Sequence, residues 1–218
     1  MSVHLFRELE RLKTRLLALG EAVDRQLQNV ITAINVRDDA EAANLAAHDH
    51  TIDDAEVDIE EECLKMLALY QPVAGDLRFI ITVLKIGKDL ERIGDIAVHL
   101  AIRCTTAVAR IPALAIPDDF VITTARTSAL LQQYLHALTT LDAGAARNIC
   151  ASDVEIDRLC RRMYDTMKSS ISTQPATAND MLDLLVIPRQ LERIADYIVN
   201  MAEDLLYMIE GRLVRHIR

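Results

Sequence analysis

The sequence predicts an all-α protein, a tandem repeat of two antiparallel three-helix bundles with six long helices. Helix breakers are scarce, with only 6 Gly and 5 Pro in 218 residues, below their usual shares of about 7% and 5%. Aromatic residues make up 4% and Trp is absent, whereas residues that favour helices are abundant. The two halves of the chain also resemble each other, so one helical unit is expected to occur twice.

Capping and turn-forming residues divide the chain into the six expected helices. Asp76 follows a Gln-Pro turn and can cap a helix, and the polar residues around Asp38 and Asp142 indicate two further helix starts. Short loops make consecutive helices antiparallel. The expected helices span residues 3–35, 39–69, 76–109, 118–140, 143–171 and 179–211.

An internal repeat sets the expected domain organisation. Residues 84–95 match residues 185–196 at an offset of 101, and Asp38 matches Asp142 at an offset of 104. Because the offset changes so little between these matches, each half is expected to form one three-helix unit. The expected domains are residues 1–110 and 118–218, with a Pro-containing linker between them.

Charge and hydropathy exclude several function classes. The formal net charge is −9 and no basic block is present, so nucleic acid is not an expected partner. No segment is long and apolar enough to span a membrane, and the first residues lack the apolar core of a signal peptide. We therefore expect a soluble, cytoplasmic protein. Four isolated Cys residues are expected to be buried, reduced thiols: Cys63, Cys104, Cys150 and Cys160.

Pairs of acidic residues recur at corresponding places in both halves. The members of each pair are four residues apart, so they share one helix face, and such a like-charged pair costs an isolated helix about 0.2–0.5 kcal/mol. Because four such pairs occur, we expect a partner of opposite charge that offsets their repulsion. The second helices carry Asp49 with Asp53 and Asp153 with Asp157, and the third helices carry Glu91 with Asp95 and Glu192 with Asp196.

The hairpin geometry places these pairs level with one another. Asp95 lies 23 residues after Pro72 and Asp49 lies 23 residues before it, so the two side chains are expected side by side on neighbouring helices. The second hairpin gives the same result. Four carboxylates in each half then point into water, shift their pKa values, or bind a multivalent cation. We expect a metal site, because the arrangement occurs twice.

The type of metal ion follows only in part from the ligands. Carboxylate oxygens favour hard cations such as Mg, Ca, Mn or ferric iron, and zinc accepts them too. A solvated acidic face, with Arg92 and Arg193 as local ion-pair partners, is the alternative. His99 and Asn200 lie one turn further along the third helices and are candidate supporting groups.

Other features bear on catalysis and on helix geometry. Pro188, at the repeat position of Gly87, either bends its helix beside the acidic face or is a tolerated irregularity. No Glu is followed by a His three residues later, as a ferritin-type di-iron site requires. The chain also has no glycine-rich phosphate loop and no H-E-x-x-H motif. We therefore expect that the protein is not an enzyme.

Several stretches carry a family resemblance. Residues 69–78 read LYQPVAGDLR and residues 90–95 read LERIGD, preceded by FRELE at 6–10 and DHTID at 49–53. The second half keeps a Gln-Pro step at 174–175 and LERIAD at 191–196 but lacks the PVAGDLR run. On these motifs the chain resembles the PhoU family of phosphate-uptake regulators.

The resemblance implies a fold, a site and a role. It implies two PhoU-like three-helix repeats whose eight acidic residues named above hold multinuclear iron or zinc clusters, with Mg, Mn or Ca not excluded. It further implies a cytoplasmic negative regulator of phosphate uptake and of the phosphate-starvation response. This regulator would act as an adaptor between the PstB-like ATPase of the Pst transporter and a PhoR-like sensor histidine kinase. It would meet the membrane only through these complexes, and a homodimer is expected.

Two alternatives remain at this point. A metal-free helical scaffold would be indifferent to chelators and to replacement of the acids. A metal-dependent phosphohydrolase would use a two-metal carboxylate site, but the sequence offers no assigned base, nucleophile or pocket for one.

Overall fold

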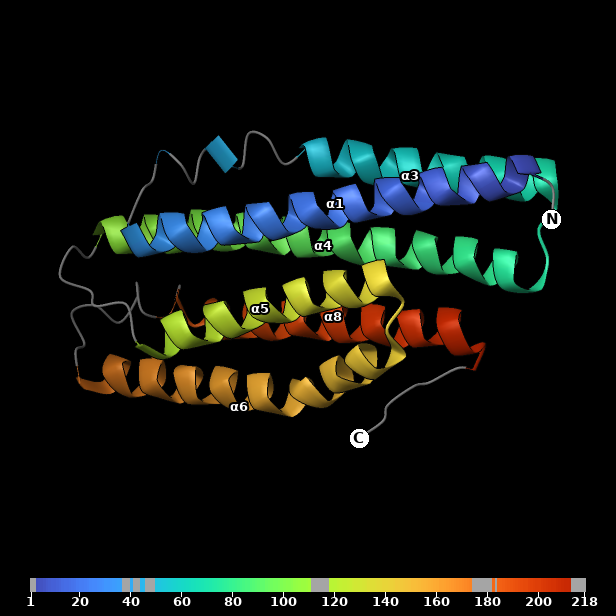
Figure 1. The fold of residues 1–218 in the computed structure, drawn as a ribbon. Coiled ribbons are helices and arrows are strands. Elements are labelled where there is room, and N and C mark those ends of the chain that lie inside the picture. Colours follow the sequence, from blue (N-terminus) through green and yellow to red (C-terminus); the bar gives the residue numbers. More distant parts are fainter. Residues whose placement is uncertain are drawn as a thin grey trace.

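A computed structural model of the chain describes residues 3–36, 40, 44–45, 50–110, 118–173, 182 and 184–212. Over these residues the chain forms long helices and no strand, which confirms the predicted all-α tandem architecture (Figure 1). The helices are α1 (Val3–Val36), α3 (His50–Tyr70), α4 (Ala74–Arg110), α5 (Asp118–Thr140), α6 (Ala143–Thr173) and α8 (Val186–Glu210).

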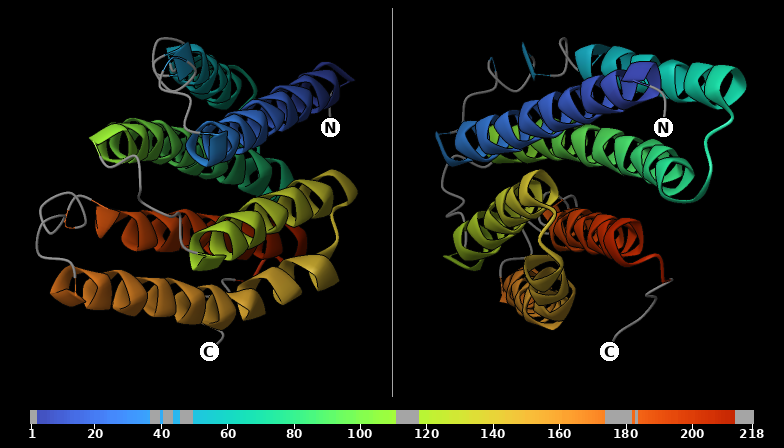
Figure 2. Two further views of the ribbon diagram at one scale, coloured as in Figure 1. Left: turned by 90° about the vertical axis from the view of Figure 1, so that its left-hand side faces the viewer. Right: turned by 45° about the vertical axis from the view of Figure 1, so that its right-hand side comes forward.

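The helices form two three-helix units that pack against each other. In the first half α1, α3 and α4 contact one another, and in the second half α6 packs on α8 while α5 packs on both. Contacts of α4 with α8 and of α1 with α5 join the halves. Both Figure 1 and Figure 2 show α3 and α6 as the outermost helices on opposite sides of the molecule.

The first helix shows why these segments are helical. Its apolar residues recur every three or four positions and form one continuous buried stripe. Full burial of each such side chain stabilises the fold by about 1.5–3 kcal/mol. The stripe consists of Leu5, Leu9, Leu12, Leu16, Leu19, Val23, Leu27, Val30 and Ile34.

The internal repeat is visible in the pattern of burial. Ile52 and Ile156, which are 104 residues apart, are both buried, and so are Leu90 and Leu191, which are 101 residues apart. The same offsets therefore identify equivalent positions of the two halves in three dimensions. The linker at 111–117 and the expected start of the second helix at 39 lie outside the described residues.

The turns and helix ends agree with the sequence in part. The Asp142 carboxylate accepts hydrogen bonds from the backbone N–H groups of Gly144 and Ala145, at 2.8 and 3.0 Å, and so caps α6 as expected. Helix α4 begins at Ala74, two residues before the expected cap. Gln71 and Ala74 have positive φ angles of 46° and 47°, so this turn uses the left-handed region without a glycine.

The helix that carries Pro188 is interrupted close to this residue. The helix predicted from residue 179 is interrupted by a turn at Leu185, and α8 begins at Val186, so Pro188 lies in its first turn. Proline lacks the N–H group that would bond the carbonyl of Leu184, four residues earlier, and the first turn of a helix does not need that donor. Residues 174–181 lie outside the described part of the chain.

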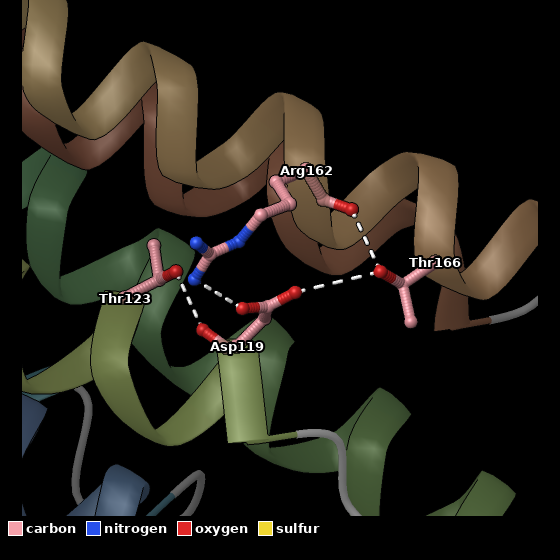
Figure 3. A network of polar contacts seen from close by, with 4 residues as sticks. All are labelled: Asp119, Thr123, Arg162 and Thr166. Atoms are coloured by element: carbon pink, nitrogen blue, oxygen red, sulfur yellow. Dashed lines mark hydrogen bonds and ion pairs between the residues drawn. The ribbon is translucent and has the colours of Figure 1, made fainter.

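Polar contacts fasten the helices at several points. Between the halves, the Lys85 ammonium lies 2.7 Å from an Asp204 carboxylate oxygen. Within the second half, Asp119 at the start of α5 accepts hydrogen bonds from Arg162 and Thr166 of α6 (Figure 3). These pairs fix the relative positions of α4 and α8 and of α5 and α6.

The structure also describes the state of the cysteines and the apolar character of the helices. None of the four cysteines, all of which the structure describes, forms a disulfide; Cys63, Cys104 and Cys160 are buried as predicted, and Cys150 is half-buried. Burial raises the pKa of each of the three buried thiols to about 12. Among the described helices, none combines the length and the apolar character that crossing a bilayer requires.

Candidate functional site

Three of the predicted metal candidates converge in the first half of the chain. Asp53 of α3 and Glu91 and Asp95 of α4 each offer a carboxylate oxygen, and these oxygens lie within 4.8 Å of one another. Asp53 is exposed, while Glu91 and Asp95 are half-buried. The structure therefore brings these three candidates together as an acidic trio, and their role as metal ligands stays a prediction. The fourth candidate, Asp49, lies outside the described residues.

A close approach of α3 and α4 holds the acidic trio together. Gly94 lies between Glu91 and Asp95 in the sequence, and a Cβ atom there would lie 3.3 Å from Ile52 Cδ1. On the other side, the side-chain amide of Gln26 donates a hydrogen bond of 3.2 Å to the Gly94 carbonyl. The absence of a side chain at Gly94 thus allows the residue next to Asp53 to pack directly on α4.

Glu56 is a further acidic group that the sequence analysis missed. It lies on α3, three residues after Asp53, and only 7% of it is exposed. Burial raises its pKa; the positive charge of Lys88 opposes this shift, and the charges of Glu60, Glu91 and Asp53 add to it. The i, i+3 spacing from Asp53 could have revealed Glu56, because such residues share a helix face.

Lys88 supplies a positive charge inside this acidic region. Its ammonium nitrogen lies 3.2 Å from Glu91 Oε2 and 3.9 Å from Glu56 Oε2. Partial burial lowers the pKa of Lys88, but the interactions with Glu91 and Glu56 outweigh this and leave the pKa above its ordinary value. Lys88 therefore neutralises part of the negative charge that the helices bring together.

The donor set of the trio fits a cation. Glu91 Oε2 is buried and has no hydrogen-bond partner, although the Lys88 ammonium is close. Metal–oxygen bonds of about 2.0–2.6 Å keep the ligand oxygens of one ion at most about 4–5 Å apart. The three carboxylate oxygens, which all lie within 4.8 Å of one another, meet this limit. Oxygen ligands alone suit a hard cation, and zinc accepts them as well.

The two supporting candidates are placed differently from each other. The His99 ring is exposed, with Nδ1 2.8 Å from the Asp95 carbonyl oxygen. Asn200 lines a polar cavity of about 440 Å³ between α4 and α8, together with Asp89 and Asp204. Burial raises the pKa of Asp89 to about 6. Asn200 thus faces the first half of the molecule.

The described acids of the second half do not reproduce the acidic trio. Asp157 and Glu192 line one cavity of about 500 Å³ between α6 and α8, and Asp196 is exposed. Asp153 lies in α6, but its side chain is outside the description. Within the described part of the chain, the first-half trio is the only set of three or more potential ligands within 4.8 Å of one another. Cys160, at the repeat position of Glu56, lies close enough for the charges of Glu192, Asp157 and Asp196 to add to the effect of burial in raising its pKa.

Fold and site together define a class of protein. It is a helical protein of two repeated three-helix units, with a carboxylate cluster between the second and third helices of the first unit. The profile of the PhoU domain matches residues 16–103 and 124–205, one match in each half. The chain belongs to the PhoU family.

Named relatives cover nearly the whole chain. The phosphate-specific transport system accessory protein PhoU homolog of Pseudomonas aeruginosa is 32% identical over 96% of this chain and 87% of its own length. The phosphate-specific transport system accessory protein PhoU of Escherichia coli K12 is 29% identical over the same shares. Each is an accessory protein by name.

Solved structures of the family share the fold. The crystal structure of the phosphate transport system regulatory protein PhoU from Streptococcus pneumoniae superposes with a TM-score of 0.86 at 28% identity, covering 97% of this chain and 99% of that one. PhoU from Pseudomonas aeruginosa gives a TM-score of 0.88 at 31% identity, covering 94% and 99%.

Proposed function

We propose that this protein is a cytoplasmic accessory protein of a phosphate-specific transport system, in which it restrains phosphate uptake and the phosphate-starvation response. The observation that supports this role most strongly is the match of both halves to the PhoU domain. The names of the relatives from Pseudomonas aeruginosa and Escherichia coli point to the same system.

The proposed mechanism is that of an adaptor without catalytic activity. Long packed helices form a rigid body that docks on the ATPase of the transporter and on a sensor histidine kinase, and it favours their inactive states when phosphate is plentiful. The proposal includes a homodimer as the working form. The rigidity rests on the continuous apolar core that runs through both halves.

A cation bound by Asp53, Glu91 and Asp95 is part of the proposal. Such an ion would neutralise the acidic trio and fasten α3 to α4. Iron or zinc is proposed first, with Mg, Mn or Ca as further candidates. The second-half acids are proposed as a weaker site, because Asp157 and Glu192 share their cavity with arginines and with the Cys160 thiol.

One observation favours a metal-free scaffold as the second candidate. Lys88 already supplies a positive charge to Glu91 and Glu56, so the fold can tolerate this cluster without an ion. Metal analysis of the purified protein separates the two candidates, since the scaffold retains no metal after gel filtration.

The regulatory role is tested in cells that lack the protein. Deletion is expected to raise phosphate uptake and starvation-gene expression at high phosphate, and the wild-type chain is expected to restore both. Unchanged uptake and expression after deletion would refute the proposed role. A variant with Asp53→Asn, Glu91→Gln and Asp95→Asn then reports how far the role depends on the cation site.

A further inference from the structure

The cavity between α6 and α8 contains two arginines that have no partner among the residues that the structure describes. Arg161 of α6 and Arg189 of α8 both line this space of about 500 Å³. Of the ion pairs and side-chain hydrogen bonds among described residues, none involves either guanidinium. Guanidinium groups present several donors in a planar fork that matches carboxylate and phosphate oxygens.

The internal repeat shows that this arrangement belongs to the second half alone. At the offset of 104, Glu56 corresponds to Cys160, Val57 to Arg161 and Glu60 to Tyr164, and the first pair is buried in both halves. Two carboxylates are thus replaced by a thiol and a phenol, and an apolar side chain is replaced by a cation. The second half has changed from a cation-attracting surface to one of mixed charge.

The same comparison shows that Arg189 and its first-half counterpart have different surroundings. At the offset of 101 it corresponds to Lys88, which lies close to Glu56 and Glu91. Because Cys160 stands at the position of Glu56, one of the two carboxylates that would hold Arg189 is missing. In the first half the Lys88 ammonium pairs with carboxylates of the protein, whereas in the second half the Arg189 guanidinium is available to a ligand.

The arginines next to Arg161 on α6 also differ in whether they have an ion-pair partner. Arg162 is held by Asp119, as Figure 3 shows. Arg158, Arg161 and Arg162 line a shallower depression along α6, and Arg158 also lacks a partner among the described residues. Arg161 thus lies where the depression meets the deeper cavity, because it lines both.

From these observations we infer that the cavity between α6 and α8 binds a small oxyanion, the phosphate group of inorganic phosphate or of a phosphate monoester, through Arg161 and Arg189. Tyr164, which is 42% exposed and lines the same cavity, adds a phenolic hydroxyl. Leu185, Val186 and Pro188 form an apolar wall against which the organic part of a monoester would lie. The volume is within the range of about 300–1,000 Å³ found for small-molecule sites.

The acids in the cavity make a prediction that distinguishes an anion site from a metal site. Asp157 and Glu192 line the same space and repel an anion. Glu192→Gln is therefore expected to strengthen oxyanion binding several-fold, whereas the same change would weaken a cation site. The inference goes beyond the proposed regulatory role and needs no metal, so it is tested in the presence of a chelator.

The test is calorimetric titration of the full chain with inorganic phosphate and, separately, with adenosine monophosphate. The variant Arg161→Gln/Arg189→Gln is expected to lose at least tenfold in affinity. The control Arg25→Gln/Arg126→Gln removes two exposed surface arginines, each paired with a glutamate, and changes the net charge equally. It is expected to bind as the wild type does. Unchanged melting temperatures establish that all variants fold.

Each outcome decides the inference. Tighter binding of inorganic phosphate identifies the free ion as the ligand, and tighter binding of the nucleotide identifies a monoester. The inference is overturned if neither compound binds at about 10 mM, if the control variant loses as much affinity as the Arg161→Gln/Arg189→Gln variant, or if Glu192→Gln weakens binding.

Discussion

Lys88 is expected to compete with a bound cation for the acidic trio. Its ammonium lies 3.2 Å from Glu91 Oε2, so an ion at the trio and the lysine would use the same carboxylate. Lys88→Gln removes the internal cation and leaves Glu91 and the buried Glu56 without it. The metal-free protein should lose stability, and the affinity for a divalent cation should rise.

The size of both effects follows from the geometry. At 3.2 Å the pair is worth about 1.3 kcal/mol at the dielectric constant of water and about 5 kcal/mol at an effective dielectric constant of about 20. Lys88 is 48% exposed, so solvent screening puts the value near the lower limit, at about 1–2 kcal/mol. If the Lys88–Glu91 pair is absent from the metal-bound state, Lys88→Gln raises the affinity for the metal ion by the same free energy, about 5–30-fold.

Two measurements test this prediction. Chemical denaturation in chelator gives the stability of the metal-free protein, and calorimetric titration with Mn²⁺ gives the affinity. The matched control is Lys85→Gln, one turn earlier on α4, whose ammonium pairs with Asp204 at 2.7 Å. It should destabilise the protein with and without metal and leave the affinity unchanged. Equal Mn²⁺ affinities of wild type and Lys88→Gln would refute the reasoning.

Three further predictions concern packing, pH and thiol reactivity. Gly94→Ala should lower the free energy of unfolding by about 1–3 kcal/mol and weaken cation binding, since the new Cβ would lie 3.3 Å from Ile52. Gly87→Ala is the control, because its Cβ would lie 3.8 Å from Ile59. In urea denaturation the control should be neutral or stabilising. The pKa of Asp89 is raised from 3.8 to about 6 in the folded state. The protonated carboxyl group therefore makes its full contribution to stability below pH 3.8, and this contribution is lost as the pH rises through about 6. The melting temperature of Asp89→Asn should therefore rise relative to that of the wild type as the pH is raised from about 5 to about 7.5. A difference in melting temperature that stays constant over this range would contradict the prediction. Iodoacetamide should modify the half-buried Cys150 first in the native protein, because the other three thiols are buried with pKa values of about 12; mass spectrometry showing earlier modification of Cys160 would argue against the described packing.

The fold followed from the sequence because its signals were redundant. The apolar period of α1 specifies a helix, and the offset between the halves specifies that one unit occurs twice, so the two signals support one architecture. Counting residues from Pro72 also placed Asp53 level with Glu91 and Asp95, because straight antiparallel helices have equal rise per residue. The start of the last helix was less predictable, since a proline bends or begins a helix according to the path of the preceding residues.

The details of the site depended on packing that spacing does not encode. Glu56 forms a pair of acids with Glu60, but this pair has no counterpart in the second half, where Cys160 and Tyr164 stand, so a search for repeated acid pairs passes over it. The same search passes over Lys88, which is a cation. The difference between the halves depends on Cys160 replacing Glu56, a change whose effect appears only when Arg189 is seen in the cavity. Side-chain partners across helices therefore had to come from the structure.

The central claim is that Asp53, Glu91 and Asp95 hold a cation between α3 and α4, and metal analysis of the purified protein tests it most directly. After equilibration with metal and gel filtration, the wild type should retain bound metal, and the Asp53→Asn/Glu91→Gln/Asp95→Asn variant should retain much less while remaining folded. Equal metal content in the two proteins, or none in the wild type, would contradict the claim.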